Sequence, residues 1–127
     1  MADKGGSQMA CEIIKITDSL VHARIRDVMR GTDQKMLESV AVELIEKGKK
    51  VRLLAVLENF KGWEKGGAGA DLGFMMDHYD DIVKMAIVGD ERWKEETLLY
   101  VGKGLRSTEI EFFPPSSLKQ AEEWVKT

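Results

Sequence analysis

The hydrophobic positions of this 127-residue chain divide it into alternating strand and helix segments. The run Val51–Glu58 is almost continuously apolar, which predicts a strand covered on both faces, as central strands of parallel sheets are. Val83–Val88 is a second run of this kind. Earlier in the chain, Cys11–Thr17 and the alternating segment Leu20–Val28 flank a turn signal, so together they predict an antiparallel hairpin.

Helical periodicity predicts the elements that connect and follow these strands. Between Leu37 and Ile45, apolar side chains recur at i, i+3, i+4, i+7 and i+8, and Thr32 is the predicted N-cap of this helix. An alternating edge strand is expected at Ser107–Phe113. Three further helices are predicted, at about Ala70–Ile82, at Glu91–Gly104, and from Ser116 or Ser117 towards Val125.

This order of elements predicts an α/β fold. Strands that alternate with helices form parallel sheets with right-handed crossovers. We therefore expect a mainly parallel sheet of about five strands, with an N-terminal antiparallel hairpin and about four helices. The length suits a single domain over residues 1–127, and the polar residues 1–9 are expected to be flexible.

Composition narrows the classes of function and location. The chain is 43% hydrophobic and 32% charged, with a formal net charge of −3, so it lacks the basic excess of a nucleic-acid-binding protein. Its one cysteine cannot form an internal disulfide, which fits a reducing compartment. The first residues lack the apolar segment of a signal peptide, and no apolar run reaches the ~18 residues of a membrane span. We expect a cytoplasmic protein.

The sequence contains no motif that carries catalysis or metal binding. His22, His78 and Cys11 do not have the spacing of metal ligands. The glycines at 66, 67, 69 and 73 match neither a dinucleotide fingerprint nor a phosphate-binding loop, and no nucleophile elbow is present. We therefore predict no catalytic residue, no metal and no cofactor, and we do not expect an enzyme.

Large apolar side chains exceed what a small two-layer core needs. One interpretation places them in the core or in a homodimer contact. The other places them in an apolar groove for a non-polar ligand, because pockets for such ligands are apolar with few polar groups. In open α/β sheets these sites lie beyond the carboxyl ends of the strands. The predicted groove lies between the second and third helices and comprises Phe60, Trp63, Leu72, Phe74, Met75, Trp93, Leu98 and Tyr100.

Several local patterns resemble the SpoIIAA-like family, small bacterial proteins related to STAS domains. They are Gly31-Thr32 after the alternating strand, the Phe60, Gly62 and Trp63 pattern, the segment MAIVGDERW at 85–93, and EIEFF at 109–113. The resemblance implies a STAS-like fold without established catalytic residues. It also implies binding of a non-polar ligand between helices and contact with a membrane, which the net charge of −3 predicts to be weak.

A second kind of function stays open beside the carrier. Anti-sigma-factor antagonists of the STAS class have a phosphorylatable serine at the start of the helix after the central strand. The corresponding stretch Gly62–Gly73 contains no serine or threonine. Our first hypothesis is therefore a non-catalytic binding or carrier domain for a lipid-like molecule, cytoplasmic or peripheral to the membrane. The alternative is a protein-interaction regulator without the phosphorylation site.

Overall fold

Five strands form one sheet in the computed structural model, which describes residues 10–64, 81–101, 103 and 107–127. The strands lie in the order β1-β2-β3-β4-β5. The β1–β2 pair is antiparallel and the other three pairs are parallel, which confirms the predicted mixed sheet with its N-terminal hairpin. The strands are β1 Cys11–Thr17, β2 Leu20–Met29, β3 Val51–Trp63, β4 Ile82–Val88 and β5 Glu109–Phe113.

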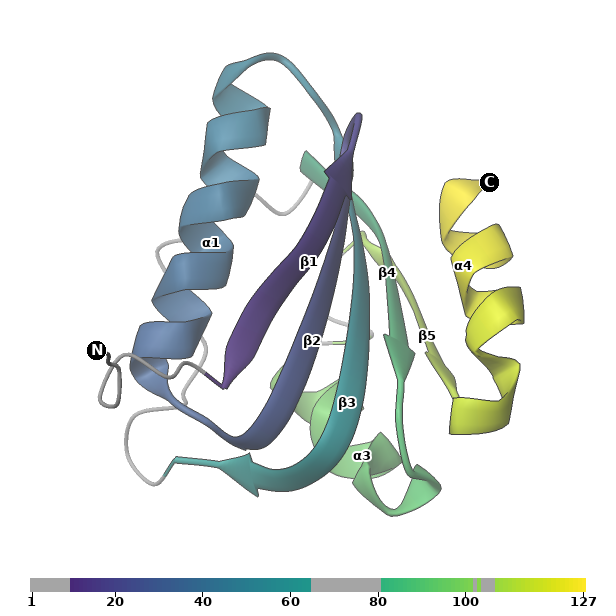
Figure 1. Ribbon diagram of the computed structural model, residues 1–127. Coiled ribbons are helices and arrows are strands. Elements are labelled where there is room, and N and C mark those ends of the chain that lie inside the picture. Colours follow the sequence, from purple (N-terminus) through teal and green to yellow (C-terminus); the bar gives the residue numbers. More distant parts are fainter. Residues whose placement is uncertain (1–9, 65–80, 102, 104–106) are drawn as a thin grey trace.

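Helices cover the sheet on both faces. Helix α1 (Gly31–Glu46) and helix α3 (Lys94–Tyr100) lie on one face, and α4 (Leu118–Lys126) lies on the other, against β3 and β4 (Figure 1). Single 3₁₀ turns, η3 (Glu91–Trp93) and η4 (Pro115–Ser117), precede α3 and α4. Within the described part of the chain, no helix is long and apolar enough to cross a membrane.

The structure corrects three details of the predicted helices. The sequence predicts about four helices, and the described residues contain three α-helices. The predicted second helix lies outside the described residues except at its end, where Ile82 is instead the first residue of β4, because it continues the buried run of that strand. The predicted third helix is a 3₁₀ turn followed by a shorter α-helix that ends at Tyr100.

Strand β3 is packed on both faces, as its apolar run predicts. On the α4 side, Leu54 and its neighbour on β4, Ala86, contact a cluster that includes Ala121 and Val125. On the α1 and α3 side, Ala55 belongs to the larger core cluster. The sheet therefore separates two cores. The larger one draws on all five strands, with the buried members Cys11, Val21, Ala23, Ile25, Met29, Val51, Ala55, Phe60, Ile82, Met85, Ile87 and Ile110 joined by Ala41 and Leu44 of α1.

A buried carboxylate fixes the start of α1. Asp33 is fully buried, and its side chain accepts hydrogen bonds from the backbone N–H of Cys11 at 3.1 Å and of Arg30 at 2.8 Å, and from Nε of Arg30 at 3.2 Å. The predicted N-cap Thr32 is wrong: the cap is Arg30, whose N–H the carboxylate satisfies. Burial and the nearby Asp33 raise the pKa of the Cys11 thiol to about 12. Asp33 thus joins the first strand to the first helix.

We predict that Leu54→Ala lowers the free energy of unfolding by about 2–5 kcal/mol, because it leaves a cavity in a core that relaxes only partly. Leu54 is 1% exposed. Urea denaturation measures the change, and Leu99→Ala is the control, since Leu99 is 81% exposed and its truncation should cost less than about 0.5 kcal/mol. Equal effects at the two positions would contradict the double-sided burial of β3.

We also predict that Asp33→Ala destabilises the fold by about 3 kcal/mol, because the buried N–H of Cys11 and two part-buried donors of Arg30 lose their acceptor at once. Glu43→Ala, on the exposed surface of α1, is the matched control and should change stability by less than about 0.5 kcal/mol. Thermal unfolding of both variants provides the comparison. A loss at Asp33 no larger than the loss at Glu43 would show that the carboxylate does not fix the helix start.

Candidate functional site

An apolar pocket of about 140 Å³ lies between the sheet and the helices α1 and α3. Its floor follows β3 along the length of the strand. Strands β2 and β4 add Val21, Ile25, Ile82 and Met85, among others, and the helices form the opposite wall. The β3 side chains that line it are Val51, Leu53, Ala55, Leu57, Phe60 and Trp63.

A bulge in β3 places Phe60 on the pocket side of the sheet. From Val51 to Leu57 the lining positions alternate, as the period of a strand requires, but the step from Leu57 to Phe60 is three residues. Asn59 between them has φ +49°, and the pairing of β2 with β3 shifts register here. Such an irregularity reverses the alternation. Without it, Phe60 would face the α4 side.

Four aromatic rings gather at the carboxyl end of β3. The Phe60 ring lies edge-on to Trp63 at 5.0 Å and to Trp93 at 5.1 Å between ring centroids, and Trp63 lies 5.0 Å from Tyr100. Edge-to-face pairs of this kind each contribute about 0.5–1.5 kcal/mol beyond burial. Gly62 has φ +109°, and a Cβ there would lie 3.5 Å from the Trp93 ring, so glycine suits this close approach.

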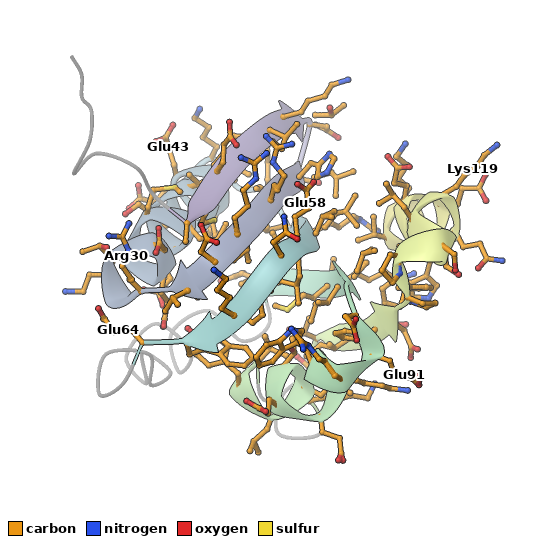
Figure 2. The ribbon with its side chains drawn as sticks, turned by 60° about the horizontal axis from the view of Figure 1, so that its bottom comes forward. Arg30, Glu43, Glu58, Glu64, Glu91 and Lys119 are labelled. Atoms are coloured by element: carbon orange, nitrogen blue, oxygen red, sulfur yellow. The ribbon has the colours of Figure 1, made fainter. Side chains whose placement is uncertain are left out.

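The end of β3 is fixed against the start of α1. The N–H of Glu64 donates to the carbonyl of Met29 at 2.9 Å, and the N–H of Gly31 donates to Oε1 of Glu64 at 3.3 Å. Figure 2 shows Arg30 and Glu64 together at this end of the molecule. These contacts hold Trp63 and the first turns of α1 at the same end of the pocket.

Polar side chains of α1 and α3 line the pocket beside the aromatic rings. The Tyr100 hydroxyl donates to Oε1 of Gln34, and Nε2 of Gln34 donates to Glu38 at 2.9 Å. Burial and the nearby carboxylate of Glu38 raise the pKa of the Tyr100 phenol to about 12. Thr97, one turn before Tyr100, also lines the pocket and is 4% exposed. Its Oγ1 has no hydrogen-bond partner among the described residues.

Five of the eight residues predicted for the groove lie in the part of the chain that the structure describes. Phe60, Trp63 and Tyr100 line the pocket, whereas Trp93 and Leu98 pack behind it against the same core. Ligand binding by these side chains stays a prediction. The remaining three, Leu72, Phe74 and Met75, lie outside the described residues.

Sequence reasoning did not include the wall that α1 provides. The sequence predicts a groove between the second and third helices. The pocket is also lined by four residues of α1, which are Gln34, Leu37, Glu38 and Ala41. Leu37 and Ala41 belong to the apolar stripe of α1, so their position beside the sheet could have been inferred. Gln34 and Glu38 are one helical turn apart on an edge of that stripe, where polar residues normally face solvent.

Neither a metal centre nor a nucleophile is evident in the residues that the structure describes. No three His, Cys, Asp or Glu side chains gather there in a way that could hold a metal ion. Cys11 is buried, and its raised pKa keeps the thiol protonated. The pocket therefore offers binding surface and a few hydrogen-bonding groups.

The fold and the pocket define a class of protein: an α/β domain with a hairpin-initiated, mainly parallel sheet and an apolar pocket on one face. The family model described as SpoIIAA-like matches residues 13–126, and the chain belongs to this SpoIIAA-like family. This membership supports a non-catalytic binding or regulatory domain in general terms.

A solved structure shows the same fold. It is an uncharacterized protein of the DUF3478 family with a SpoIIAA-like fold, from Shewanella loihica PV-4. The two chains are 18% identical and superpose with a TM-score of 0.62, over 91% of this chain and 92% of the other. No curated protein matches this chain.

We predict that Tyr100 stays protonated at pH 11, because its pKa of about 12 lies above the ordinary value of 10.0. The phenol ionises at lower pH in the unfolded chain than in the native one. Its contribution to stability is therefore complete below about pH 10 and is lost as the pH rises through about 12.

The ultraviolet difference spectrum between the wild type and Tyr100→Phe tests this assignment. Native protein should show little phenolate difference at 295 nm at pH 11, and the same pair in denaturant, as control, should show most of it. A native difference at pH 11 as large as the difference in denaturant would mean that Tyr100 is solvated.

Proposed function

We propose that this domain is a non-catalytic binding or carrier domain for a small non-polar, lipid-like molecule held in the pocket between the sheet, α1 and α3. The observation that supports the proposal is the pocket itself. Its floor is almost wholly apolar, whereas its polar side chains lie at one wall, on α1 and α3. Sites for non-polar ligands combine apolar walls with a few polar groups in this manner.

The size of the pocket limits how much of a ligand it encloses. An engineered apolar cavity of about 150 Å³ in another protein holds one benzene molecule. The pocket of about 140 Å³ therefore accommodates one ring or a short alkyl segment. Each methylene that moves from water into such a site contributes about 0.8 kcal/mol, so a short segment suffices for measurable binding.

Membrane association and a regulatory role have less support. Leu99 on α3 is 81% exposed, but a single exposed apolar side chain is common on protein surfaces. No observation on the described residues favours docking of a protein partner over binding of a small molecule. The proposal therefore rests on the pocket alone.

We expect 1-octanol to bind saturably to the wild type and about tenfold more weakly to Ala41→Leu. Ala41 is 7% exposed and lines the pocket, so a leucine there would occupy space that about two methylenes of the ligand need. Amide chemical shifts, followed during an octanol titration, measure both affinities. Native mass spectrometry of protein purified from its own cells would identify a retained ligand.

The matched control is Val42→Leu, which enlarges the adjacent residue of α1 outside the pocket lining and should leave the affinity unchanged. If octanol does not bind saturably to the wild type, or if the two variants lose affinity equally, the pocket is not the binding site and the proposal is wrong.

A further inference from the structure

The pocket is elongated along the strands of the sheet. Its lining follows β2 from Val21 to Met29 and β3 from Val51 to Trp63. Because a strand rises about 3.3 Å per residue, the lining positions from Val51 to Leu57 alone cover about 20 Å. The volume of about 140 Å³ is distributed along this length, so the space is narrow at each point.

The pairing register arranges the sheet side of the pocket in successive rows across β2, β3 and β4. A strand presents every second residue to one face, so before the bulge in β3 the rows lie about 6.6 Å apart. A compact cavity would touch neighbouring rows only, whereas this pocket extends from the first row to the last. From the amino ends to the carboxyl ends of the strands, the rows are Val21, Leu53 and Met85, then Ala55 and Ile87, then Ile25 and Leu57, and finally Met29 and Trp63.

Helix α1 lies along the same axis on the opposite wall. It begins at the carboxyl ends of the strands and runs back towards their amino ends (Figure 1). Gln34 near its start and Ala41 further along both line the pocket. They are seven positions apart, which corresponds to about 10.5 Å along the helix axis. The helix and the sheet therefore enclose one long, narrow space.

The two ends of this space differ in polarity. At the carboxyl end, Gln34 accepts a hydrogen bond from the Tyr100 hydroxyl, and its amide donates to Glu38 at 2.9 Å. Among the described residues, the sheet lining at the amino end is wholly apolar and comprises Val21, Val51, Leu53, Ile82 and Met85. A polar group placed there would lose its hydration without gaining a hydrogen bond, which is unfavourable. The polar end of a ligand therefore belongs at the carboxyl end.

From these observations we propose that the pocket selects an unbranched alkyl chain with a polar group at one end. The chain lies along β3 towards the amino ends of the strands, and the polar group lies beside Gln34 and Tyr100. The inference rests on the proposed function and narrows its ligand class. The same volume in a compact cavity would suit a ring, and in this elongated form it suits a straight chain.

Two alcohols of the same formula test the shape of the site: 1-octanol, which is unbranched, and 2-ethyl-1-hexanol, which carries a side branch. Both are titrated into the wild type and followed by amide chemical shifts. They share their polar group and their number of carbon atoms, so they differ mainly in width. 1-Octanol should bind at least about tenfold more tightly, because the branch must displace closely packed lining side chains. Equal affinities would overturn the proposed selection.

Chain length tests the direction in which the ligand lies. At no more than about 1.5 Å per bond, 1-butanol is too short to reach Ala41 from Gln34, whereas 1-octanol is long enough. 1-Butanol should therefore shift the amides of Trp63 and Tyr100, and 1-octanol should shift the amide of Leu53 as well. A shift at Leu53 that is as large with 1-butanol as with 1-octanol would contradict the proposed orientation.

Ala41→Leu provides a second test of the orientation, because it narrows the pocket away from its polar end. The affinity of 1-octanol should fall about tenfold in this variant, and that of 1-butanol by less than about twofold. Val42→Leu, outside the pocket lining, is the control and should change neither affinity. General loosening of the fold would weaken both alcohols alike, so equal losses in Ala41→Leu would count against the inference.

The outcomes separate this inference from the proposed function. If neither isomer of octanol binds saturably to the wild type, the pocket is not a binding site and both proposals fail. If the two isomers bind with equal affinity, the pocket binds non-polar molecules without selecting an unbranched chain, and only this inference is wrong. Tighter binding of 1-octanol, together with a loss in Ala41→Leu that grows with chain length, supports it.

Discussion

The packing of β3 on both faces is the constraint on which the rest of the structure depends. Along this strand, Leu54 faces the core under α4, and the next residue, Ala55, faces the core and pocket under α1 and α3. A shift of one residue in its pairing would exchange the two faces and place each set of side chains in the core that fits the other set. The packing on each face therefore fixes the register of β3 independently. Both faces of the strand need a cover, so α1 and α3 lie on one face and α4 lies on the other.

The strands could be predicted from the sequence because their apolar runs are distinctive, whereas their ends depend on contacts with distant residues. The expected end of β3 at Glu58 is five residues short of its end at Trp63. Asn59 and Gly62 are residue types that are typical of loops, and both have positive φ. They nevertheless lie within β3, because β2 still pairs with the strand there. The start of α1 differs for a similar reason, because the carboxylate of Asp33 also accepts a hydrogen bond from the backbone N–H of Cys11, a contact that no local pattern records.

The aromatic part of the site could be inferred from an excess of large apolar side chains, and its polar part could not. Phe60 and Trp63 come directly after the apolar run of β3 in the sequence, so their position at the carboxyl end of the strand could be inferred from the fold. The contact of Gln34 with Tyr100 depends on how α1 and α3 approach each other over the sheet. Helical periodicity gives the face of each helix but not the distance between two helices, and so it could not show that Tyr100 reaches Gln34.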